Sequence, residues 1–103
     1  MKLVYIAGAY RGDGKLDTIY ENIQTARKYA KKYWELGYAV ICPHMNSALM
    51  DGVCDDKIFL DGDIEILKRC DIIVMLPNWE QSDGATKEVY EAWENGLEII
   101  YED

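Results

Sequence analysis

Basic residues are scarce in this sequence: 11 Lys and Arg stand against 19 Asp and Glu, which gives a formal net charge of -8. A binding face for polymeric nucleic acid needs many cations to meet the phosphates, so this balance argues against that function. The two basic pairs, Arg27-Lys28 and Lys31-Lys32, are expected to form a solvated helix face. The sequence has no apolar run of membrane length and no signal-like N-terminus, so we predict a soluble, cytoplasmic protein that does not bind membranes.

Paired cysteines are also lacking. Cys42, Cys54 and Cys70 form no C-x-x-C pair and are odd in number, as expected for reduced thiols in a cytoplasm. A metal site that combined Cys42, His44 and Cys54 would match no familiar ligand spacing, so we predict no metal site. Repeats are absent and 103 residues suffice for one core, so we predict a single domain over residues 1–103.

The sequence does contain a regular alternation of short apolar runs and helical stripes. The apolar runs cover residues 3–7, 38–42, 72–76 and 97–101. Helical stripes run from residue 17 or 18 to Gly37, over residues 57–70, and from Gly84 to Asn95. This order predicts an α/β fold, a three-layer, doubly wound flavodoxin-like or Rossmann-like domain with a four-stranded parallel sheet of order 2-1-3-4.

Carboxylates interrupt the apolar stripes of the two later helices, at Asp63 and at Glu88. A carboxylate on a core-facing stripe is costly unless it is paired or faces solvent or a ligand. The side chain of Glu88 leans toward the helix start, where Gly84 has no Cβ and Ser82 or Asp83 can cap the helix. On helix position alone, a surface salt bridge or a loop cap explains Glu88 equally well.

The predicted topology brings these carboxylates to one edge of the sheet. Open α/β sheets bind ligands beyond the carboxyl ends of the strands, at the point where the strand order reverses, here between the first and third strands. The loops over residues 8–14 and 77–84 both open there. The first loop is neither G-x-G-x-x-G nor a P-loop, so it is either a phosphate site with Arg11 or a plain connection. Tyr5 needs a partner for its hydroxyl, and Glu88 is the candidate.

Three short motifs, in this order and spacing, resemble the nucleoside 2-deoxyribosyltransferase superfamily over nearly the whole chain. They are Tyr5-Ile-Ala-Gly-Ala-Tyr-Arg-Gly12, then Asp63 eight residues before Asp71, then Ser82-x-Gly84-x-x-x-Glu88. The closer resemblance is to the branch of 2′-deoxynucleoside 5′-monophosphate N-glycosidases and to small phage and bacterial domains of unassigned function allied with it.

The resemblance implies a role for each motif residue. The glutamate that matches Glu88 attacks the sugar C1′, the aspartate that matches Asp63 assists the departing base, and the tyrosine that matches Tyr5 orients the glutamate. Ser82 and Arg11 match contacts to the 5′-phosphate, so the implied substrate is a small-molecule nucleotide, and the chemistry needs no metal and no cofactor. The candidate substrate-binding residues are Gly8, Ala9, Arg11, His44, Trp79, Ser82 and Gly84.

Several alternatives stay open at this point. His44 either touches the ligand or is structural, and Trp79 either stacks on a base or packs against its own helix. The relatives usually have a fifth strand and a C-terminal polar group that reaches into the neighbouring subunit, whereas four strands are predicted here. Surplus aromatics on the first helix favour a homodimer or higher oligomer. Hydrolysis of an N-glycosidic bond is the leading hypothesis, beside base transfer and non-catalytic nucleotide binding.

Overall fold

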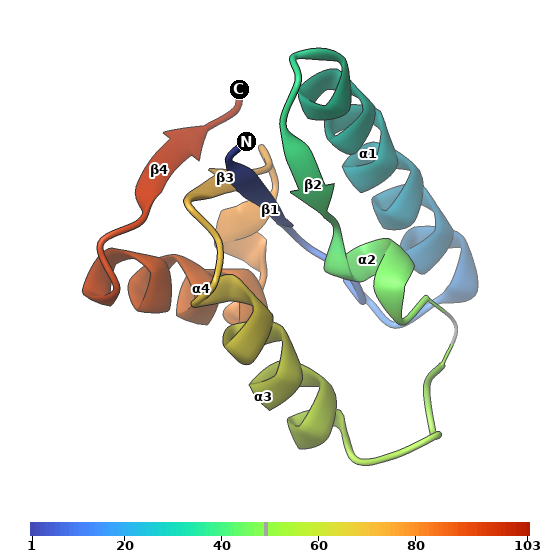
Figure 1. The fold of residues 1–103 in the computed structure, drawn as a ribbon. Helices are drawn as coiled ribbons and strands as arrows, with labels where there is room; N and C mark the ends of the chain where they lie inside the picture. The colour runs from blue at the N-terminus through green and yellow to red at the C-terminus, as the bar shows by residue number, and fades with distance from the viewer. Residues whose placement is uncertain (49) are drawn as a thin grey trace.

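Strands and helices alternate along the chain in the computed structural model, which describes residues 1–48 and 50–103 (Figure 1). The strands are β1 (Leu3–Ala7), β2 (Ala39–Ile41), β3 (Ile72–Met75) and β4 (Glu98–Tyr101). The helices are α1 (Leu16–Glu35), α2 (Pro43–Asn46), α3 (Asp56–Leu67), the 3-10 turn η1 (Trp79–Gln81) and α4 (Asp83–Glu94).

The four strands form one parallel sheet of order β2-β1-β3-β4. Strand β1 is central, and its Tyr5 lies opposite Ile41 of β2 on one side and Ile73 of β3 on the other. The predicted fold class and strand order are therefore confirmed. After β1 the chain continues on one face of the sheet, and after β3 it continues on the other. The loops after these two strands therefore diverge, which leaves a crevice between them.

Alternation along β1 divides the core into two layers. Val4 and Ile6 pack toward α1, whose buried stripe includes Ala26 and Ala30. Tyr5 and Ala7 belong to a second cluster, with residues of α3, α4 and β3. Helices α3 and α4 lie on the side of the sheet away from α1 (Figure 1). Because side chains of a strand alternate between faces, the tyrosine of β1 and the helices that carry the two carboxylates share one side of the sheet.

The sequence shows neither an apolar run nor a helical stripe between residues 43 and 56, but the structure contains the short helix α2 there. Proline at the first helical position has a φ that already suits a helix, and four residues are too few to show an apolar period. Helix α1 begins at Leu16, one or two residues before the predicted start at residue 17 or 18, and its basic face is exposed as expected. Among the described residues, no helix is both long and apolar enough to cross a membrane.

Candidate active site

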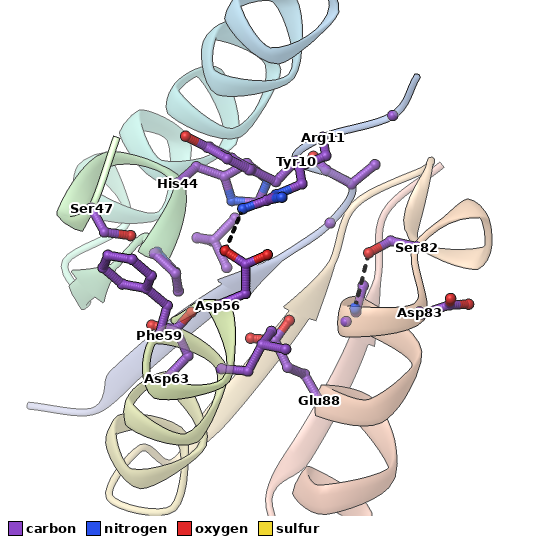
Figure 2. A pocket seen from close by; sticks show the side chains of 18 of the residues that line it. Tyr10, Arg11, His44, Ser47, Asp56, Phe59, Asp63, Ser82, Asp83 and Glu88 are labelled. Atoms are coloured by element: carbon purple, nitrogen blue, oxygen red, sulfur yellow. Dashed lines mark hydrogen bonds and ion pairs between the residues drawn. The ribbon is translucent and has the colours of Figure 1, made fainter. Parts of the chain in front are cut away.

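A cavity of about 420 Å³ opens at the carboxyl ends of β1 and β3, between the loop after β1 and the N-terminal turns of α3 and α4 (Figure 2). This volume lies within the range of small-ligand sites. Eight of the predicted site residues line it: Gly8, Ala9, Arg11, His44, Asp63, Ser82, Gly84 and Glu88. The sheet edge that the sequence predicts as a binding site is therefore hollow.

Tyr5 lies beneath the cavity and is fully buried, and its hydroxyl donates a hydrogen bond to Oε2 of Glu88. This is the partner that the sequence predicts for it. Burial, together with the negative charge of Glu88, raises the pKa of Tyr5 above its ordinary value, so the phenol stays protonated and remains a donor. The bond joins β1 to α4 across 83 residues of sequence and fixes the orientation of the carboxylate.

Glu88 and Asp63 reach into the same cavity from neighbouring helices, Glu88 from α4 and Asp63 from α3 (Figure 2). Both side chains are partly buried. Burial raises the pKa of Glu88 to about 7, with a further contribution from the charge of Asp63 and an opposing one from the Tyr5 hydroxyl. Burial raises the pKa of Asp63 to about 6. Two carboxyl groups that titrate near neutrality can divide the roles of nucleophile and proton donor between them.

The N-terminus of α4 faces the cavity. Ser82 is the N-cap, and its Oγ accepts a hydrogen bond of 3.1 Å from the backbone N–H of Ala85. Gly84 follows in the first turn and lines the cavity without a side chain. A helix N-terminus carries partial positive charge, so this end of α4 favours an anionic ligand group.

The loop after β1 contributes shape more than free polar groups. A Cβ on Gly8 would lie 2.7 Å from Cδ1 of Leu76, so only glycine fits there without a shift. The N–H of Ala9 donates to Oδ1 of Asn78 at 3.1 Å, and the carbonyl of Ala9 lies 2.7 Å from Nε2 of His44. Ala9 thus lines the cavity while both its backbone polar groups are engaged within the protein.

The sequence leaves open whether His44 contacts the ligand or is structural, and the structure has features of both. It is 5% exposed and its ring packs edge-on against Tyr10, yet it also lines the cavity. A carbonyl can only accept, so Nε2 of His44 carries the proton that is donated to Ala9, and Nδ1 is a lone-pair acceptor. Nδ1 has no hydrogen-bond partner among the described residues, and burial lowers the pKa of His44, which keeps the ring neutral.

Arg11 lies at the mouth of the cavity, and it pairs with carboxylate side chains that the sequence does not predict as its partners. Its Nη2 donates to Oδ1 of Asp56 at 2.7 Å and lies 4.0 Å from Oδ1 of Asp51. Both aspartates also line the cavity. They belong to the region between α2 and the first turn of α3, and no local pattern links Asp56 to an arginine 45 residues earlier, or Asp51 to the same arginine.

Trp79 is the predicted site residue that the structure places elsewhere. It does not line the cavity but packs against the core between the sheet and α4, with its ring centroid 5.8 Å from that of Tyr101 on β4. The 3-10 turn η1 directs it there, toward the neighbouring strand. The packing alternative is therefore the one observed, and Trp79 is withdrawn from the set of substrate-binding candidates.

Three comparisons with known proteins bear on this site and fold. A search of curated proteins finds no significant match. Among solved structures, the chain is similar to a protein described as a 2-desoxiribosyltransferase from Leishmania mexicana, with 20% sequence identity and a TM-score of 0.57. That likeness covers 98% of this chain and 63% of the longer relative, and at such identity it establishes the fold. The family described as "Domain of unknown function (DUF4406)" matches residues 2–101, and the chain belongs to that family.

Proposed function

We propose that this protein hydrolyses the N-glycosidic bond of a nucleoside 5′-monophosphate, with Glu88 as the nucleophile of the first step. The observation that carries the proposal is the pairing of the Glu88 carboxylate with the buried Tyr5 hydroxyl, beside Asp63, in one cavity at the sheet's switch point. Its support is the agreement between this geometry, the three sequence motifs and the fold shared with a deoxyribosyltransferase.

In the first step, the carboxylate of Glu88 attacks C1′ of the sugar. The bond between C1′ and the base nitrogen breaks, its electron pair leaves with the base, and Asp63 in its acid form supplies a proton to the base. Tyr5 holds the carboxylate oxygen that does not attack. The result is a glycosyl ester on Glu88 and a free base.

In the second step, water attacks C1′ of the ester. Asp63, now a carboxylate, takes a proton from that water, and the C1′–O bond to Glu88 breaks to return the free carboxylate. The sugar 5-phosphate leaves. Because the pKa of Glu88 is about 7 and that of Asp63 about 6, the reactive form, with Glu88 ionised and Asp63 protonated, is a minor form that is most populated between these values.

The 5′-phosphate would bind at the N-terminus of α4, near Ser82 and Gly84, with Arg11 at the mouth. Helix N-termini and guanidinium groups both favour phosphate oxygens. Binding energy from this remote group would position C1′ against Glu88. His44 would form part of the cavity wall as a neutral ring, held by its hydrogen bond to the carbonyl of Ala9.

The direct test is to incubate the protein with a panel of ribonucleoside and 2′-deoxyribonucleoside 5′-monophosphates and to measure free base by chromatography. We expect release from at least one member, and loss of that release in Glu88→Ala. Absence of free base from every member at high protein concentration contradicts the proposal.

Base transfer is the second candidate, because the similar solved structure is described as a desoxiribosyltransferase. In that reaction an acceptor base, not water, resolves the glycosyl ester. The two candidates separate in one assay, since transfer yields a new nucleoside or nucleotide only when an acceptor base is added. Base release without any acceptor favours hydrolysis.

A further inference from the structure

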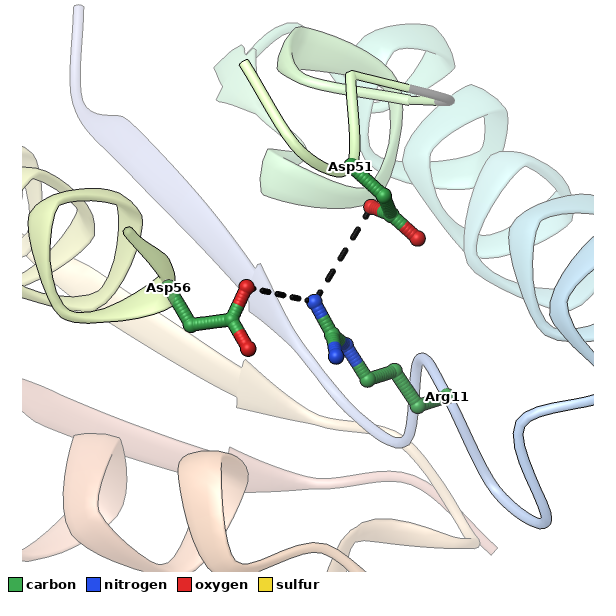
Figure 3. Close-up of polar contacts among 3 residues, drawn as sticks. All are labelled: Arg11, Asp51 and Asp56. Atoms are coloured by element: carbon green, nitrogen blue, oxygen red, sulfur yellow. Dashed lines mark hydrogen bonds and ion pairs between the residues drawn. The ribbon is translucent and has the colours of Figure 1, made fainter. Parts of the chain in front are cut away.

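Arg11 is held at the cavity mouth by carboxylates from a distant part of the chain (Figure 3). Its guanidinium donates to Asp56, in the first turn of α3, at 2.7 Å, and a second carboxylate, that of Asp51, lies 4.0 Å away. All three side chains line the cavity and are about half exposed, at 51%, 59% and 50% for Arg11, Asp56 and Asp51.

This pairing matters because of the charge of the cavity. Among the described residues that line it, Arg11 is the one cationic side chain, since burial keeps His44 neutral. A guanidinium binds a carboxylate and a phosphate with the same donors. An anionic ligand group that approaches Arg11 therefore meets a donor already bound to Asp56, and two like charges beside it.

We propose that Asp56 determines the specificity of the site by competing with the substrate's 5′-phosphate for Arg11. The inference rests on the proposed function, because it assumes that the ligand carries a phosphate. Asp56 occupies in the free protein the position on Arg11 that a phosphate oxygen takes in the complex. It thereby lowers the affinity for phosphorylated ligands and leaves unphosphorylated ones unaffected.

The exchange is physically easy. An ion pair between half-exposed side chains is weak, so a phosphate with two negative charges can replace the single charge of Asp56. Once released, the Asp56 carboxylate stays in the first turn of α3, where water and the partial positive charge of the helix N-terminus stabilise it. The carboxylate of Asp51, 4.0 Å from Arg11, is half exposed, so it can turn into water when the phosphate binds.

The test measures dissociation constants by calorimetry for nucleoside 5′-monophosphates and for the matching free nucleosides. Glu88→Gln serves as the parent protein, because it lacks the nucleophile and leaves the ligands intact. Adding Asp56→Asn should tighten binding of the monophosphates roughly 3- to 10-fold and change binding of the nucleosides by less than about twofold. In an Arg11→Ala background, Asp56→Asn should give no such gain, because the shared partner is missing.

The matched control is Asp61→Asn, which removes the same charge from the same helix but from an exposed residue paired with Lys57. It should leave the ratio of monophosphate to nucleoside affinity unchanged. An equal effect of Asp61→Asn and Asp56→Asn, or a gain that persists without Arg11, overturns the inference. So does the failure of every monophosphate to bind. Binding that follows the expected pattern, with no base released by the wild-type protein, refutes the proposed hydrolysis and supports the role of Asp56.

Discussion

Glu88 lines the cavity with a partly buried carboxyl group. Burial raises its pKa from 4.5 to about 7, so between these values the folded protein holds a proton that the unfolded chain has already lost. The contribution of Glu88 to the free energy of unfolding therefore falls as the pH rises through this window and is lowest above pH 7. A residue that destabilises the fold when charged is typical of a functional site.

Replacing Glu88 by Gln should remove this penalty. Gln does not ionise, and its amide oxygen can still accept the hydrogen bond from Tyr5. We expect Glu88→Gln to raise the free energy of unfolding by about 1–3 kcal/mol near pH 8 and to make little difference near pH 4. Urea denaturation at both pH values measures this. Glu65→Gln, at an exposed site on α3, is the control, and a gain that is equal at both pH values contradicts the prediction.

Asp63 should control the alkaline side of the pH profile. The reactive form needs Glu88 ionised and Asp63 protonated, and the two groups titrate as a coupled pair with pKa values of about 6 and about 7. We expect a bell-shaped profile of kcat/KM for base release with its limbs near these values. Asp63→Asn should remove the alkaline limb and lower kcat/KM roughly 100-fold or more. An alkaline limb that persists in Asp63→Asn assigns the proton donor elsewhere.

At this scale the sequence predicts a contact only where burial demands one. The Tyr5–Glu88 bond follows from the sequence because a tyrosine in a buried strand needs a partner, and few polar side chains can reach it. The Arg11–Asp56 pair does not follow, because both side chains are about half exposed and each could be solvated instead. The sequence does not decide the role of Trp79 for a similar reason, because an aromatic ring can pack in a core as well as stack on a base.

At the scale of elements, the first turn of α4 has both a structural and a proposed binding role, and Ser82 variants separate them. Ser82→Ala removes the N-cap bond to Ala85 and should cost about 1 kcal/mol of stability. Ser82→Asp keeps an N-cap acceptor and should preserve stability, but its charge should repel a bound 5′-phosphate. Calorimetry with nucleoside monophosphates provides the second measurement. If Ser82→Asp binds them as well as the wild type does, the phosphate does not lie at this helix end.

The two cavity glycines should respond oppositely to alanine. A Cβ at Gly8 would lie 2.7 and 2.9 Å from side-chain atoms of Leu76, so Gly8→Ala should destabilise the protein by about 1–3 kcal/mol. At Gly84 the nearest atoms are 3.7 and 3.8 Å away, and Gly84→Ala should be neutral or stabilise α4 by up to about 1 kcal/mol. Thermal melts of both variants test this. Equal effects would show that loop packing does not require Gly8.

Helix prediction fails where a helix is short. The three long helices follow from apolar stripes of ten or more residues, and the strands follow from short apolar runs between those stripes. Helix α2 and the turn η1 have four and three residues, too few for any period to appear. Both lie in connections at the carboxyl edge of the sheet, where they position His44 in the cavity wall and Trp79 outside it.

At the scale of the whole molecule, topology rather than local sequence assembles the site. The cavity draws on the loop after β1, the region before α3 and the start of α4, which lie far apart in the chain. Parallel strands bring their carboxyl ends to one edge, so residues separated by tens of positions meet there. The expected homo-oligomer stays a prediction. Its candidate contact surfaces are those that carry exposed aromatic side chains, namely Tyr20, Trp34, Tyr90 and Trp93.

The net charge of -8 leads to the last prediction, because two electrostatic effects oppose each other. Repulsion among 19 acidic side chains destabilises the compact state, and salt screens it. The ion pairs Lys57–Asp61 and Arg11–Asp56 stabilise it, but exposed pairs contribute only about 0.2–1 kcal/mol each. The pair Lys32–Glu102, whose carboxylate is 14% exposed, adds to them. Repulsion should prevail, so the melting temperature should rise by a few degrees between about 20 mM and 0.5 M NaCl. A fall would mean that these pairs, the Arg11 contact at the cavity mouth among them, stabilise the fold more than excess negative charge weakens it.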